Sequence, residues 1–365
     1  MKKETAYQIA TTLIPGIGDV GGKKFVDYCG SAEAVFQEKR KALEKIHGLK
    51  EVSIDAICNP KDILKRAEQE VAFIEQNGIQ PLFYQDYDYP RRLLQCADSP
   101  MMLYYKGKAP LNANRVVAIV GTRNISDYGK ACCSKLVEDF IDDEVLVVSG
   151  LAYGVDSLAH RTAVKVGIPT VGVLGNGLQQ IYPAANKKLA EEMLANGGLL
   201  TECLSGMSPE KHNFPRRNRI IAGMADAVIV IESALKGGSL ITADLANSYS
   251  RDVFAYPGRV NDRFSQGCNY LIRTNRAHLM EGVAQLRYVM RWEPRRHEER
   301  QTSIFREFSE EETLIMNCFK DQSIVNLDDL IVKTDLPTTK LASLLLNLEF
   351  DGILLALPGK RYQRC

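Results

Sequence analysis

Short apolar runs alternate with helix-like segments through the middle of the chain. VVAIV at 116–120 and VLVV at 145–148 are each followed by small residues and then by an amphipathic segment, and the same pattern follows 170–174 and 227–231. Apolar runs of four to six residues are typical of strands that helices cover on both faces. The pattern therefore predicts an α/β fold with a doubly wound, mostly parallel sheet.

The two ends of the chain follow other patterns. Residues 1–78 predict a small helical domain of the SAM or helix-hairpin-helix type, with a Pro-Gly-Ile-Gly turn at 15–18 that suits either a phosphate-binding hairpin or a plain tight connection between helices. The charged, proline-containing stretch 291–305 is typical of a linker. Three helical patterns and a hairpin around 358–359 then predict a winged-helix-like domain over 306–365, which leaves 79–290 for the core.

Composition and charge limit what the protein can be. The 365 residues are 45% apolar and 25% charged, as in an average soluble globular protein of two or three domains. Forty-six Lys and Arg oppose 45 Asp and Glu, for a net charge of +1. Any nucleic-acid surface must therefore come from local clustering of basic residues.

Cysteines and apolar run lengths indicate a cytoplasmic protein. The nine cysteines include no C-x-x-C pair, which favours reduced thiols over disulfides or a zinc site. Glu4 and Gln8 interrupt the apolar segment that a signal peptide needs, and no apolar run is long enough to cross a bilayer. We expect no membrane partner and no metal.

Small residues and one arginine follow the predicted strands. Parallel strands end at one edge of a sheet, so these loops should converge on one crevice, where helix N-termini and a guanidinium suit a phosphate-bearing ligand. Alternatively, the glycines only make tight strand-to-helix turns. The loops are Gly121-Thr122-Arg123, Ser149-Gly150, Gly175-Asn176-Gly177 and Gly237-Gly238-Ser239. None has the spacing of a dinucleotide fingerprint or a P-loop, so we predict no nucleotide cofactor.

The stretch 212–244 combines a basic cluster with apolar helix and strand patterns. Arg216, Arg217 and Arg219 open the predicted helix and cannot all point the same way. Some should face the crevice, and others should face solvent or an acidic neighbour. Phe214 could stack on a base, as in sequence-tolerant single-strand binders, or could pack the start of the helix.

No arrangement of residues requires an enzyme. Asp156 and His160 lie four apart on one helix face, which more often makes a structural pair than half of a catalytic site. Glu202 and Glu232 end strands near the crevice, but no serine lies in a G-x-S-x-G elbow.

Six motifs resemble those of the DNA-processing protein A family, also called DprA or Smf, in the family's order. They are GTRNISDYG (121–129), SGLAYGVDSLAH (149–160), GNGLQQIYPAAN (175–186), FPRRNRIIAG (214–223), GGSLITADLA (237–246) and VFAYPG (253–258). The resemblance spans roughly 80–280. It implies a Rossmann-like core that binds and protects incoming single-stranded DNA, forms a homodimer, and helps to load the RecA recombinase during natural transformation.

The resemblance also implies which residues bind DNA. Arg123, Lys211, Phe214, Arg217, Asn218 and Arg219 would line the site, and Gly121, Thr122, Ser149, Gly238 and Ser239 would supply backbone and hydroxyl donors. The chain departs from the family at Arg276, where a glycine is usual. The edge of the predicted crevice near Arg276 is therefore either less open than usual or has an additional phosphate contact.

Two other classes of function stay open. A nucleotide-processing enzyme of the phosphoribohydrolase type would carry a P-G-G-x-G-T-x-x-E turn, and the stretch 236–242 lacks that proline, with no matching glutamate after it. Alternatively, the winged helix could bind duplex DNA or another protein and dominate the function.

Overall fold

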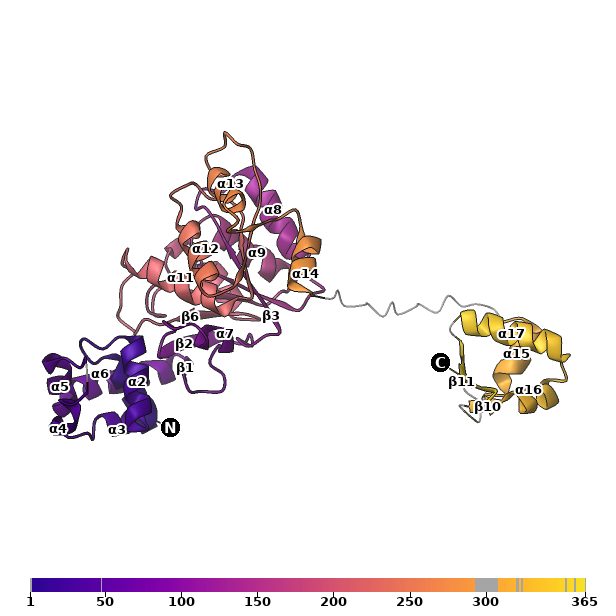
Figure 1. Cartoon of the computed structure of the whole chain (residues 1–365), viewed down its shortest axis with the longest axis horizontal. Helices are drawn as coiled ribbons and strands as arrows, with labels where there is room; N and C mark the ends of the chain where they lie inside the picture. The colour runs from indigo at the N-terminus through magenta and orange to yellow at the C-terminus, as the bar shows by residue number, and fades with distance from the viewer. Residues whose placement is uncertain are drawn as a thin grey trace. The chain divides into compact units, whose positions relative to one another are not determined.

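The computed structural model describes residues 2–46, 48–292, 308–319, 322, 324–351, 353–357 and 359–364 (Figure 1). The chain divides into two compact units, Met1–Arg295 and Arg296–Cys365. Most of the predicted linker, from residue 293 on, lies outside the described residues. In the part of the chain that is described, no helix has the length and apolar character to cross a membrane.

Six helices open the first unit: α1 (Lys2–Thr12), α2 (Asp19–Cys29), α3 (Ala32–Val35), α4 (Arg40–Leu43), α5 (Glu51–Cys58) and α6 (Lys61–Gln76). They lie beside β1 (Gln80–Phe83) and β2 (Met102–Gly107) in Figure 1. Ile9 and Phe25 from the helices share one apolar cluster with Leu103 and Tyr105 of β2. The helical segment is therefore packed onto one edge of the sheet.

The first unit is built on a nine-stranded sheet of order β1-β2-β6-β5-β4-β3-β7-β8-β9. All neighbouring pairs from β6 to β9 are parallel, whereas β2 is antiparallel to both β1 and β6. The prediction of a mostly parallel sheet is thus confirmed. The further strands are β3 (Arg115–Val120), β4 (Val145–Ser149), β5 (Thr170–Val173), β6 (Gly198–Thr201), β7 (Ala227–Val230), β8 (Asp252–Ala255) and β9 (His278–Leu279).

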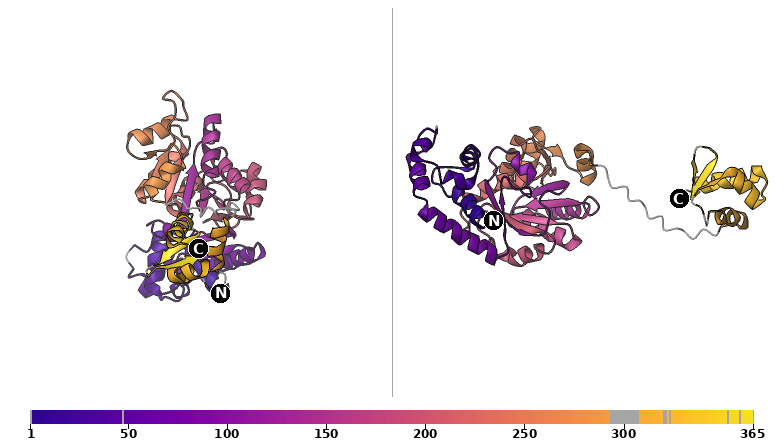
Figure 2. Two further views of the ribbon diagram at one scale, coloured as in Figure 1. Left: turned by 90° about the vertical axis from the view of Figure 1, so that its right-hand side faces the viewer. Right: turned by 90° about the horizontal axis from the view of Figure 1, so that it is seen from below.

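Helices cover both faces of this sheet (Figure 2). Along β3, Val116, Ala118 and Val120 belong to one apolar cluster, while Val117 and Ile119 belong to a second cluster on the other face. This alternation explains why the strand is apolar throughout. The helices are α7 (Arg91–Leu94), α8 (Asp127–Glu138), α9 (Val155–Val166), α10 (Lys187–Met193), α11 (Asn213–Met224), α12 (Gly238–Ser248), α13 (Gln266–Arg273) and α14 (Val283–Met290), with a 3-10 turn η1 (Ala184–Asn186).

The winding direction reverses between β3 and β7. From β3 the chain adds β4, β5 and β6 on one side, then returns through α11 to place β7 on the other side of β3. At such a switch point the loops at the carboxyl ends of the two central strands diverge and leave a crevice. The fold therefore sets the position of a ligand site before any side chain is considered.

The second unit contains α15 (Glu310–Asn317), β10 (Ile324–Asn326), α16 (Leu327–Thr334), α17 (Thr338–Phe350), β11 (Leu354–Leu357) and β12 (Arg361–Arg364). Leu330, Leu341 and Leu345 lie in its apolar core, and Ser309 and Glu312 form a capping box at α15. The predicted helices and hairpin are present, and β10 completes a three-stranded sheet with them.

Candidate nucleic-acid interface

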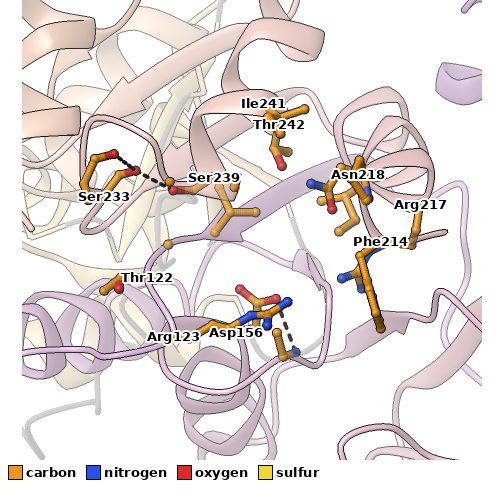
Figure 3. A pocket seen from close by; sticks show the side chains of 18 of the residues that line it. Thr122, Arg123, Asp156, Phe214, Arg217, Asn218, Ser233, Ser239, Ile241 and Thr242 are labelled. Atoms are coloured by element: carbon orange, nitrogen blue, oxygen red, sulfur yellow. Dashed lines mark hydrogen bonds between the residues drawn. The ribbon is translucent and has the colours of Figure 1, made fainter. Parts of the chain in front are cut away.

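A cavity of about 490 Å³ opens at the switch point between β3 and β7 (Figure 3). We call it the main cavity. Its walls come from the end of β3, the loop after β7, the start of α12, and the N-terminal half of α11. Nine of the eleven predicted site residues line it, namely Gly121, Thr122, Arg123, Lys211, Phe214, Arg217, Asn218, Gly238 and Ser239.

Phe214 is a half-buried ring that Arg123 and Tyr182 approach. The Arg123 guanidinium carbon lies 6.0 Å from the ring centroid, and the Tyr182 ring lies 5.5 Å away at an interplanar angle of 35°. A Cβ on Gly175 would lie 3.1 Å from Cδ1 of Phe214, so the loop after β5 supports the ring. Tyr182 is not among the predicted site residues, although it is an aromatic residue in the motif that follows this strand.

The start of α12 presents its backbone to the main cavity. Gly237 at the N-cap gives no side-chain hydrogen bond, and Gly238 and Ser239 line the cavity. The Ser239 hydroxyl donates to Ser233 Oγ at 2.8 Å, which joins the helix to the loop after β7. An uncapped helix N-terminus with small residues is a favourable place for an anion.

Arg217 forms the buried back wall. Its Nη1 donates to the carbonyls of Gly150 and Val173 at the ends of β4 and β5, and it occupies the space that a Cβ on Gly150 would need. Burial lowers the pKa of Arg217 to about 10, although the negative charge of Asp156, also in the wall, opposes this shift. The loop Ser149-Gly150 therefore contributes to the main cavity indirectly, because its Gly150 carbonyl binds the Arg217 guanidinium.

Two of the eleven predicted residues do not line the main cavity. Ser149 is fully buried, and its hydroxyl donates to the Ile119 carbonyl at 2.6 Å. Arg219 turns to the other side of α11, where its Nη2 lies 3.2 Å from Asp19 Oδ2 and also pairs with Glu202. Arg216, which is more exposed, pairs with the same Glu202 carboxylate at 2.9 Å. Arg216 and Arg219 thus meet at one carboxylate, and Arg217 alone of the three arginines lines the main cavity.

The residues considered for catalysis have structural partners. His160 Nδ1 lies 2.7 Å from Thr170 Oγ1, and burial lowers the pKa of this imidazole to about 3. Glu232 accepts a hydrogen bond from the Ser126 amide at 2.9 Å, and a second from the Ser126 hydroxyl. Among the described residues that line the main cavity, Asp156 is the only carboxylate and no histidine or cysteine occurs.

Arg276 lies away from the main cavity. Its Nη1 pairs with Asp244 Oδ1 at 3.2 Å, and both side chains are about half exposed. With Lys236 and Tyr270 it lines another hollow, which shares Gly237 and Ile241 with the main cavity. The residue that departs from the family pattern therefore does not close the predicted crevice.

Two family models match the chain. Residues 80–291 match the model described as DNA recombination-mediator protein A, and 307–360 match the DprA winged helix domain. The second match confirms the winged-helix prediction for the C-terminal unit.

Individual proteins give the same result. Protein Smf of Synechocystis is 36% identical over 74% of this chain and 68% of its own length. The crystal structure of DNA processing protein A from Streptococcus pneumoniae is similar with a TM-score of 0.65 and 32% identity, over 77% of this chain and 96% of that one. DNA processing protein A from Helicobacter pylori, whose structure concerns its single-stranded DNA binding mode, is similar with a TM-score of 0.53 and 30% identity, over 58% of this chain and 95% of that one.

The family's sequence model covers more than half of the chain, and solved members are similar in fold at about 30% identity. The chain therefore belongs to the DNA recombination-mediator protein A family, which is also named DprA or Smf.

Proposed function

We propose that the protein takes part in DNA processing during recombination by holding single-stranded DNA in the main cavity, without changing it chemically. The observation that carries this proposal is the meeting of three features at the switch point: exposed Arg123 and Lys211, the aromatic pair Phe214 and Tyr182, and the uncapped start of α12. Cations and free amides suit phosphates, whereas aromatic faces suit unpaired bases.

Each lining group has a proposed role. Arg123 and Lys211 contact phosphates, and Gly121, Thr122, Gly238 and Ser239 offer amides and hydroxyls to the same backbone. Asn218 lies one turn after Phe214 on the side of α11 that lines the cavity, and would donate to a phosphate or a base edge. Arg217 adds positive potential from the wall, while Ser149 and Arg219 hold the neighbouring loop and helix in place.

Stacking makes this binding tolerant of sequence. Every base has a face that can lie on Phe214, and base stacking on an aromatic side chain contributes about 1–3 kcal/mol. A duplex hides these faces, so it cannot use the aromatic pair. The relative from Helicobacter pylori, which binds single-stranded DNA, supports the same choice of ligand for this chain.

The remaining parts of the proposal rest on family membership. We propose that the protein acts as a cytoplasmic homodimer that protects incoming DNA and passes it to the RecA recombinase, with no cofactor. Among the described lining residues, no nucleophilic side chain is paired with a general base, which favours binding over catalysis. Release of free base from a nucleoside monophosphate would instead support a phosphoribohydrolase-like enzyme.

Binding of labelled single-stranded and duplex oligonucleotides of one sequence, compared by fluorescence anisotropy on the full chain, tests this function. We expect the single strand to bind more tightly, and we expect Lys211→Ala to weaken single-strand binding. Equal or tighter binding of the duplex, with no effect of Lys211→Ala, would move the main DNA site to the winged helix.

A further inference from the structure

A second hollow of about 690 Å³ adjoins the main cavity at Arg123, which lines both. We call it the side cavity. Its other walls come from the loop after β3, the first turn of α8, the loop after β4, and one face of α9. They include Asn124, Lys130, Tyr153, Ser157 and Arg161.

The side cavity is basic and carries its own aromatic ring. Arg123, Lys130 and Arg161 line it, and no carboxylate occurs among its described lining residues. Lys130 pairs with Asp127 at 2.8 Å, but this aspartate is almost fully exposed, so solvent screens the pair. Tyr153 is 50% exposed at the tip of its loop. The main cavity combines cations with aromatic rings in the same way.

Backbone contacts hold the loop of Tyr153 against the loop of Arg123. Gly154 has φ +78°, and a Cβ there would lie 2.3 Å from the Thr122 carbonyl oxygen. The Val155 amide donates to that same carbonyl at 3.2 Å. Because only glycine fits this conformation and this approach, Tyr153 and Arg123 are fixed as neighbours on one continuous surface.

We infer that the side cavity binds further nucleotides of the same single strand, with Arg161 and Lys130 at phosphates and Tyr153 against a base. This inference rests on the proposed function, because it extends the same strand past Arg123. A continuous strand is favoured over a free anion because the two cavities share a cation, and because both offer a ring as well as positive charge.

Two variants and a matched control test the inference. Arg161→Ala removes a cation and Tyr153→Ala removes the ring. Lys165→Ala is the control, because Lys165 is exposed one turn further along α9 and lines neither cavity. Each is measured with oligothymidylates of about 4 and about 16 nucleotides, which span the range of site sizes known for single-strand binders.

With the longer strand, we expect Tyr153→Ala to weaken binding about 10-fold. Arg161→Ala should lower the slope of log affinity against log salt by about 0.7, the value for one phosphate contact on a single strand. With the shorter strand, both variants should bind within about twofold of the wild type, since the inference places a strand of that length in the main cavity alone. Lys165→Ala should match the wild type throughout.

The inference fails if both variants match Lys165→Ala on the longer strand, or if they weaken both strands equally. The proposed function would survive the first result, provided that Arg123→Ala still weakens binding. If the wild-type protein binds neither strand, the proposed function itself fails. Thermal melting of each variant shows whether it is folded.

Discussion

Replacing Arg217 with methionine should destabilise the first unit strongly. The wild-type guanidinium is 5% exposed and donates to two strand-end carbonyls, those of Gly150 and Val173. Methionine fills similar volume but removes the donor from both carbonyls and the positive charge that interacts with Asp156. Burial already raises the pKa of Asp156, and loss of the positive charge near it would raise this pKa further. We expect the free energy of unfolding to fall by about 3–5 kcal/mol.

Arg216→Met is the matched control for this prediction. Arg216 is the adjacent residue on α11, its side chain is 55% exposed, and its partner Glu202 keeps a second arginine, Arg219. Replacing Arg216 with methionine should lower the free energy of unfolding by no more than about 1 kcal/mol. The comparison separates the cost of a buried guanidinium from the cost of removing any arginine from this helix.

Urea denaturation followed by tryptophan fluorescence measures both variants. Trp292 is the only tryptophan of the chain, and its ring lies 5.3 Å from the Arg115 guanidinium in the first unit, so its emission reports on that unit. The double variant Arg217→Met with Asp156→Asn should lose less stability than the two single losses added together, by at least about 1 kcal/mol. A loss for Arg217→Met no larger than for Arg216→Met, or strictly additive losses, would refute the reasoning.

Three further outcomes are expected. Burial lowers the pKa of His160 from 6.5 to about 3, so protonation of this imidazole favours the unfolded chain. The stability that neutral His160 provides above pH 6.5 is therefore lost as the pH falls towards 3. His160→Gln should therefore reduce the acid loss of stability by up to about 1.4 kcal/mol per pH unit in that range, measured by urea titrations at several pH values. Phe214→Ala should weaken single-strand binding by about 1–3 kcal/mol while Phe214→Trp keeps it, and equal affinities in an anisotropy titration would rule out stacking. Gly154→Ala should lower both the unfolding midpoint and DNA affinity, because a Cβ would collide with the Thr122 carbonyl; an unchanged midpoint would count against this steric account.

The sequence alone predicts the parallel sheet and two of the loops that line the main cavity. Apolar runs mark β3, β4, β5 and β7, and parallel topology brings the ends of such strands to one edge, so the contributions of 121–123 and 237–239 follow from the pattern. The strand β2 was not predicted, because an antiparallel strand at the edge of the parallel set does not continue the alternation of strand and helix.

The direction of individual side chains could not be predicted. The Arg217 and Arg219 side chains point in different directions because they interact with different acidic residues, which lie far away in the sequence. Arg217 interacts with Asp156 on α9. Arg219 pairs with Asp19 on α2 and with Glu202 just after β6. Ser149 follows a strand, as expected of a ligand residue, but its hydroxyl turns inward to the neighbouring strand β3. Tyr182 could have been included in the predicted site, because it is an aromatic residue in the segment that follows a strand. Its contact with Phe214 could not have been predicted, because nothing in the sequence links the two residues.

The salt dependence of single-strand binding by wild type and Arg123→Ala tests the central claim most directly. Arg123 is exposed, lines both cavities, and has Phe214 as its ring partner, so its removal should leave the fold intact. We predict weaker binding and a slope of log affinity against log salt that is lower by about 0.7, the value for one lost phosphate contact. A folded Arg123→Ala protein with wild-type affinity and an unchanged slope would contradict the assignment of the main cavity as the DNA site.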